Sequence, residues 1–238
     1  DGAGDQGIMY GFATFESKEL MPLPIVIARK IAIKMDELTK QIPELFGSDG
    51  KCQVSIAYDE FDNPVKVTTI IVSQQTQPNV DREFYTSFII EECLKKVIPS
   101  WLVTEETKVL INPTGEFVKG GAYADSGLTG RKIICDTYGG VGRHGGGAFS
   151  GKDPTKVDRC AAYYARYVSK NVVAAGLAKK CEVQVAYAIG VAKPVAVNIE
   201  TFGTSKYTND QIKEAVLKFF NFTPKAIRTE ILNDDISY

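Results

Sequence analysis

The residues best suited to chemistry lie in the stretch 131–166, where glycines and basic side chains are concentrated. Seven residues of this stretch are Lys or Arg and three are Asp, in a chain whose net charge is −1. Seven glycines fall between Tyr138 and Lys152. A loop this poor in side chains can turn sharply and point backbone N–H groups at a ligand. Positive charge on a glycine-rich loop indicates a polyphosphate site.

The elements around this loop are expected to be a strand over 132–137 and a helix that begins at Asp153-Pro154. A helix N-terminus has unpaired N–H groups and a partial positive charge, so it favours an anion. Lys152, Lys156 and Arg159 are spaced i, i+4 and i+7, which predicts that they share one helical face. The alternative is a flexible loop followed by a solvated basic helix.

Two nucleotide-binding motifs are matched only in part. Gly146 to Lys152 fits the P-loop pattern G-x-x-x-x-G-K, but the next residue is Asp153, which has no hydroxyl for Mg²⁺. Gly2 to Gly7 fits the dinucleotide pattern G-x-G-x-x-G, yet that motif should follow a strand, and here the strand-like alternation comes after it, over 8–16. Within this segment Asp5 is either a turn former or a ligand-binding carboxylate.

Composition indicates a globular protein of two domains, with 238 residues, 44% hydrophobic and 24% charged. The net charge of −1 argues against nucleic-acid binding, and no apolar run is long enough for a membrane span. The five cysteines are widely spaced and lack a C-x-x-C pair, which is typical of reduced thiols in a cytosolic protein. His144 is the only histidine, which excludes a metal site built from several histidines. The absence of an initial Met suggests a processed or truncated chain.

The two halves of the chain repeat one order of elements, β-α-β-β-α, at the level of architecture and not of residues. This predicts an α/β (α+β) fold of two sandwich domains, 1–120 and 121–238, each a mixed sheet with helices on one face. The expected strands are 8–16, 52–58, 65–73, 108–112, 132–137, 181–190 and 194–203, and the expected helices are 24–42, 80–98, 154–175, 208–220 and 224–232.

Several motifs together resemble the S-adenosylmethionine synthetase (methionine adenosyltransferase) family. They are Gly2-Ala-Gly-Asp-Gln-Gly7, Asp125-Ser-Gly-Leu-Thr-Gly-Arg-Lys132, Asp136-Thr-Tyr-Gly-Gly140, Gly145-Gly-Gly-Ala-Phe-Ser-Gly-Lys-Asp153 and Lys156-Val-Asp-Arg159. Family members are longer, with an N-terminal portion that carries an active-site histidine and a metal-binding aspartate. We therefore expect this chain to be the central domain and a truncated C-terminal domain.

The resemblance implies attack of the methionine sulfur on C5′ of ATP, with release of triphosphate and its hydrolysis to phosphate and pyrophosphate. Because sulfur is already nucleophilic, the main need is to stabilise negative charge on the leaving triphosphate. The family uses two Mg²⁺ ions per site and K⁺. The resemblance also implies a cytoplasmic homodimer in which the sheets of two subunits pack together and the active sites are shared. Two such dimers would form a dimer of dimers, and no nucleic-acid or membrane partner is expected.

The resemblance also implies roles for individual residues. Arg131, Lys132 and Lys152 would be catalytic, acting on the polyphosphate. Asp158 would bind Mg²⁺. The ATP and polyphosphate site would comprise Asp59, Phe117, Asp125, Arg131, Lys132, Ala148 and Lys152, and the methionine site would comprise Asp5, Asp125 and Lys156.

Some residues keep alternative interpretations. Asp158 could be only a neighbour of Lys156 on a wet helix, and Phe117 only a core residue. Glu116 departs from the arginine usual in the family, and His144 is expected to be structural. A catalytically incomplete fragment or pseudo-enzyme subunit, which dimerises and binds nucleotide weakly, is the alternative function; a P-loop NTPase is disfavoured by Asp153.

Overall fold

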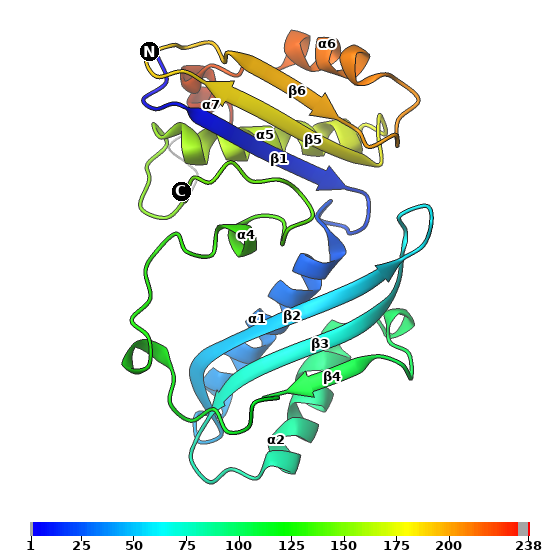
Figure 1. The fold of residues 1–238 in the computed structure, drawn as a ribbon, viewed down its shortest axis with the longest axis vertical. Coiled ribbons are helices and arrows are strands. Elements are labelled where there is room, and N and C mark those ends of the chain that lie inside the picture. The colour runs from blue at the N-terminus through cyan, green and yellow to red at the C-terminus, as the bar shows by residue number, and fades with distance from the viewer. Residues whose placement is uncertain (1, 233–237) are drawn as a thin grey trace. The chain divides into compact units, whose positions relative to one another are not determined.

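A computed structural model describes residues 2–232 and residue 238, in two compact units (Figure 1). The terminal unit comprises Asp1–Pro22 and Leu128–Tyr238, and the central unit comprises Leu23–Gly127. Each unit contains one three-stranded sheet and its own hydrophobic core. The fold is therefore mixed α/β with two sheets.

The terminal unit is built on an antiparallel sheet in the order β1-β5-β6. Strand β1 (Gly7–Thr14) pairs with β5 (Lys180–Tyr187), which pairs with β6 (Ala196–Glu200). Helix α5 (Val157–Ala174) packs on β1 and β5, as Figure 1 shows. The shorter helices are α4 (Ile133–Asp136), α6 (Asn209–Phe219) and α7 (Pro224–Ile231).

A close backbone approach joins β1 to α5. A Cβ on Gly11 would lie 1.9 Å from the backbone carbon of Ala165, so only glycine fits at this crossing. One helical position further along, the Arg166 guanidinium donates to the carbonyls of Phe12 and Leu20 at 2.9 and 2.8 Å. Strand β1 is thus attached to a helix far from it in sequence.

The central unit has a mixed sheet in the order β2-β3-β4. Strands β2 (Phe46–Tyr58) and β3 (Pro64–Thr76) are antiparallel, whereas β4 (Lys108–Ile111) runs parallel to β3. Helix α1 (Leu23–Gln41) buries its apolar stripe, which includes Ile27, Ile31 and Met35, against this sheet. A second helical stretch consists of α2 (Arg82–Ile89), a π-helical turn (Ile90–Leu94) and α3 (Lys95–Val97).

The prediction of a strand over 132–137 was wrong. These residues form the short helix α4, and Ile134, Cys135 and Asp136 are exposed. An apolar run this short is compatible with either element, and neither sheet supplies it with a partner strand.

The strand expected at 8–16 exists as β1, but it pairs with β5 and belongs to the terminal unit, not to the sheet of β2 and β3. The architectural repeat of two continuous halves is therefore not how the sheets assemble. The division into domains 1–120 and 121–238 stays a prediction.

No disulfide joins the five cysteines, all of which lie within residues 2–232. Burial raises the pKa of the Cys160 thiol to about 11 and the pKa of the Cys93 and Cys181 thiols to about 12. These three are therefore poor nucleophiles. Within residues 2–232, no helix is long and apolar enough to cross a membrane.

Candidate functional site

The first half of the glycine-rich loop, up to Gly145, is packed tightly onto the sheet of the terminal unit; the second half runs from Gly146 to Lys152. A Cβ on Gly142 would lie 2.8 Å from Cβ of Phe12, and a Cβ on Gly145 would lie 1.6 Å from the Ile8 carbonyl oxygen. Between these glycines, Arg143 donates to the Glu182 carboxylate from its backbone N–H at 3.0 Å and from Nη1 at 2.7 Å. The Glu182 side chain is only 3% exposed, so the loop is anchored by a largely buried carboxylate.

The second half of the loop leads to an ion pair at the start of α5. Lys152 Nζ lies 2.7 Å from Asp158 Oδ2, with the two side chains 30% and 22% exposed. A Cβ on Gly147 would lie 2.4 Å from the Asp158 carboxyl carbon, so the loop backbone passes directly over this carboxylate. The structure therefore brings together two of the predicted site residues and the glycine-rich loop.

Helix α5 begins later than the sequence predicts, at Val157 instead of Pro154, with Lys156 as its N-cap. Asp153 accepts a hydrogen bond from the Thr155 N–H at 2.8 Å, which makes 153–155 a turn before the helix. The Thr155 hydroxyl and backbone hold the pKa of the Asp153 carboxyl below its usual range. The prediction that Lys152, Lys156 and Arg159 share one helical face was therefore wrong.

Arg159 instead reaches back from the first turn of α5 to the loop. Its Nη1 donates to the Lys152 carbonyl at 2.6 Å, and its Nε donates to the Tyr163 hydroxyl at 3.2 Å. Asp158 also lies in this first turn, where the helix dipole favours a carboxylate.

Other predicted residues of the terminal unit lie in the glycine-rich loop or in segments next to it. A Cβ on Gly130 would lie 2.6 Å from Cβ of Ala148, so the segment that leads into Arg131 and Lys132 passes beside the loop. Arg131, Lys132 and Lys156 are exposed, and Ala148 is half-buried.

Asp5 lies in an N-terminal segment that approaches the start of α5. A Cβ on Gly4 would lie 4.0 Å from the Thr155 carbonyl oxygen, and one on Gly7 would lie 3.9 Å from Asp158 Oδ1. Asp5 itself is exposed and its Oδ1 accepts the Gln6 N–H at 2.8 Å. Both interpretations of Asp5, turn former and ligand-binding carboxylate, remain compatible with this geometry.

His144 occupies the middle of the loop. Its Nδ1 accepts the Gly146 N–H at 2.7 Å, and its ring lies 6.0 Å from that of Phe149. Partial burial lowers the pKa of this imidazole, against the opposing effects of Asp136 and Asp158. These contacts fit the expected structural role.

Three predicted residues belong to the central unit. Asp59 Oδ1 accepts the N–H groups of Phe61 and Asn63 at 2.9 and 2.8 Å, so this carboxylate caps the turn between β2 and β3. Asp125 Oδ1 accepts the Gly127 N–H at 2.9 Å. Phe117 is half-buried and its carbonyl accepts the Thr76 N–H at 2.9 Å. Their proposed roles toward ATP and methionine stay predictions.

Glu116 is exposed beside Phe117.

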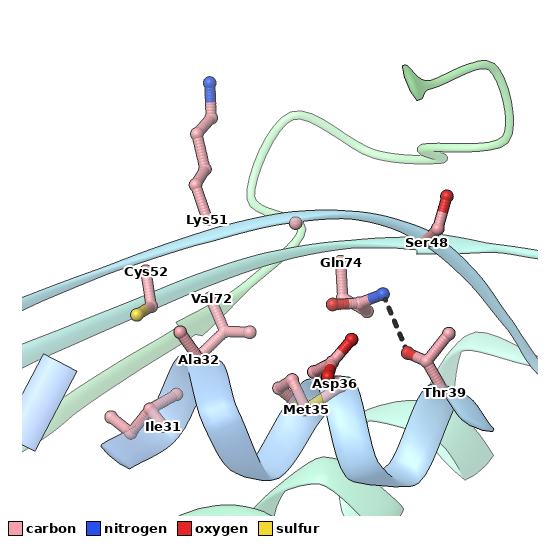
Figure 2. Close-up of a pocket in the computed structure, with 11 residues that line it drawn as sticks. Ile31, Ala32, Met35, Asp36, Thr39, Ser48, Lys51, Cys52, Val72 and Gln74 are labelled. Carbon is pink, nitrogen blue, oxygen red and sulfur yellow. Dashed lines mark hydrogen bonds between the residues drawn. The ribbon is translucent and has the colours of Figure 1, made fainter. Parts of the chain in front are cut away.

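A pocket in the central unit lies between α1 and strands β2 and β3 and contains none of the predicted residues (Figure 2). Met35 and Thr39 line it from the helix, and Gln74 lines it from β3, with its Nε2 3.5 Å from Thr39 Oγ1. Its charged lining residues are Asp36 and Lys51, and Lys51 points away from the helix in this view.

Sequence reasoning missed two contacts that shape the site. The pairing of Arg143 with Glu182 joins residues far apart in the chain, and only the sheet brings them together. The hydrogen bond from Arg159 to the Lys152 carbonyl depends on where α5 begins. The Asp-Pro-Thr turn signature at 153–155 is the signal that could have revealed this later start.

The family model described as the S-adenosylmethionine synthetase central domain matches residues 1–117, and the model of the C-terminal domain matches residues 119–238. The S-adenosylmethionine synthase of Streptococcus uberis is 56% identical over 227 residues, which are 95% of this chain and 58% of that protein.

A solved structure of an unusual S-adenosylmethionine synthetase from Campylobacter jejuni superposes with a TM-score of 0.95 at 43% identity. The match covers 99% of this chain and 63% of that one, so the chain spans less than two thirds of the length of either relative. Two matching domain models in consecutive order, with the glycine-rich loop inside the second, lead to one conclusion: the chain belongs to the S-adenosylmethionine synthetase family.

Proposed function

We propose that this chain is the central and C-terminal part of a methionine adenosyltransferase, which forms S-adenosylmethionine from ATP and L-methionine. The reaction releases triphosphate, which is then hydrolysed to phosphate and pyrophosphate. The observation that carries this proposal is the cluster at the start of α5, where Lys152, Asp158 and the glycine-rich loop meet. Membership of the family supports the reaction class.

The arrangement suits a reaction whose difficulty lies in the leaving group. An ammonium and a helix N-terminus held in place before substrate arrives stabilise a departing triphosphate without reorganisation. Lys152 is half-buried, which strengthens its attraction for phosphate relative to a lysine in bulk water. Arg131 and Lys132, next to the loop, would hold the rest of the polyphosphate, and Lys156 and Asp5 would face methionine.

Asp158 fits a magnesium role in a limited sense. Mg²⁺ is commonly bound by one or two carboxylates together with substrate phosphates. Residues 2–232 and 238 contain no group of three His, Cys, Asp or Glu side chains that could hold a metal ion. Asp158 would therefore supply one ligand and the triphosphate others, and the metal would neutralise phosphate charge. K⁺, a homodimer with shared active sites and a cytoplasmic location are proposed from the family.

The alternative function is a catalytically incomplete subunit. A chain that binds polyphosphate but does not form product would also explain the cluster. Mass spectrometry after incubation with ATP, methionine, Mg²⁺ and K⁺ distinguishes the two, since only the enzyme yields the sulfonium product.

The proposed polyphosphate site is tested by calorimetric titration with triphosphate and Mg²⁺. Lys152→Ala removes a charge-assisted contact, so we expect affinity at least about tenfold weaker, equivalent to about 1.4 kcal/mol. The matched control is Lys170→Ala, which removes an exposed lysine from helix α5, far from the loop. Unchanged affinity in Lys152→Ala, or equal loss in both variants, contradicts the assignment.

A further inference from the structure

The backbone of Lys152 is held at both of its polar groups. Its N–H donates to the Phe149 carbonyl at 3.2 Å, and its carbonyl accepts Arg159 Nη1 at 2.6 Å. This restraint falls on a residue preceded by Gly151, whose φ of +81° and open surroundings make the chain flexible there. Without the guanidinium, the carbonyl of Lys152 loses the hydrogen bond that ties it to α5.

The side-chain contacts of Arg159 lead back to Lys152 through two aromatic residues, Tyr163 and Phe149. Arg159 Nε donates to the Tyr163 hydroxyl at 3.2 Å, and the Tyr163 ring meets the Phe149 ring edge-on at 5.2 Å. Phe149 is the residue whose carbonyl holds the Lys152 N–H. Tyr238 covers the guanidinium, with Arg159 Cζ 3.9 Å from its ring centroid. A planar guanidinium can make these contacts at once, which an ammonium cannot.

We propose that Arg159 is a positioning residue that acts through Lys152. By fixing the Lys152 carbonyl, it determines the position of the Lys152 ammonium beside Asp158, where that ammonium would bind a polyphosphate. The inference rests on the proposed function only for the identity of the ligand. A lysine held in place before binding loses less conformational entropy when the phosphate arrives. Arg159 needs no contact with the ligand to have this effect.

The test is a double-mutant cycle on triphosphate affinity in the presence of Mg²⁺. We expect Arg159→Lys to weaken binding about fivefold in the wild-type background and to have no effect in Lys152→Ala, because the two residues act as one unit. Equal weakening in both backgrounds would mean that Arg159 contacts the ligand or only supports the fold, and it overturns the proposal. So does unchanged affinity in Arg159→Lys.

Arg166→Lys is the matched control. Like Arg159, Arg166 lies on α5 and donates to backbone carbonyls, but its acceptors are Phe12, Glu19 and Leu20, which lie outside the glycine-rich loop. It should lower the melting temperature yet leave triphosphate affinity within twofold. If Arg166→Lys weakens binding as much as Arg159→Lys, a general loss of structure explains both and positioning fails.

A second measurement needs no ligand and separates this inference from the proposed function. In ¹H–¹³C spectra of lysine-labelled protein, the Lys152 Cε signal is assigned by its loss in Lys152→Ala. We expect it to move toward the position of exposed lysines in Arg159→Lys and to stay in place in Arg166→Lys. An unmoved signal in Arg159→Lys overturns the inference, whereas failure of the wild type to bind triphosphate overturns the proposed function alone.

Discussion

The two halves of the glycine-rich loop differ in what their backbone and side chains contact, although both are rich in glycine. In the first half, Gly142 and Gly145 press against β1, and Arg143 pairs with the buried Glu182. In the second half, Gly147 passes over Asp158, which pairs with a half-exposed Lys152. Glycines of the first half allow the backbone to pack, whereas those of the second leave charged groups accessible. The difference indicates that the first half anchors the loop, and it is the second half to which the proposed function assigns ligand binding.

The largest effect should come from filling the closest contact of the first half. Gly145→Ala places a Cβ 1.6 Å from the Ile8 carbonyl oxygen, so β1 or the loop must shift. We expect a loss of about 3 kcal/mol in the free energy of unfolding, measured by urea denaturation.

The neighbouring Gly146→Ala serves as the control for this substitution. Its new Cβ meets nothing within 4 Å, but φ is +100°, so only backbone strain of about 1–2 kcal/mol is expected. Equal costs for the two alanines would show that close packing on β1 is not what anchors the loop.

A smaller effect should follow from breaking the anchoring ion pair. Arg143→Ala leaves the Glu182 carboxylate, 3% exposed, with one backbone N–H donor, and we expect about 2 kcal/mol of destabilisation. Lys152→Ala removes one partner of the more exposed ion pair and should cost under about 1 kcal/mol of stability. Thermal and urea unfolding of both variants measure the contrast. If Lys152→Ala proves the more destabilising, the assignment of roles to the two halves is reversed.

The smallest effect concerns His144, which lies where the two halves meet. Its pKa is lowered in the folded protein, chiefly by burial, so the unfolded chain binds a proton more readily. Stability should therefore be unaffected well above the ordinary imidazole pKa of about 6.5 and decrease as pH falls through that value. His144→Gln should lose this part of the pH dependence in unfolding measurements between pH 7.5 and 5 (roughly the imidazole range). Identical slopes for both proteins would contradict it.

The sequence by itself predicted most of the local structure and the family. Apolar periodicity located α1, β3 and the helical stretch Arg82–Val97 to within a few residues, because these patterns depend on neighbours in the chain. It also indicated β2, but that strand begins at Phe46 and not at the expected residue 52. The helix expected over 208–220 is α6, and Thr208 to Gln211 form the capping box that begins it. Charge and glycine content alone located the loop.

Tertiary structure decided the rest, because it depends on contacts between distant residues. Pairing of Gly7 with Tyr187 at the start of β1 assigns that strand to the terminal unit, which no local pattern records. Ile133–Asp136 is helical because neither sheet offers it a partner, although its residues suit a strand. The later start of α5 turns Arg159 back onto the Lys152 carbonyl, so the neighbourhood of Lys152 is set by packing and not by spacing along the chain.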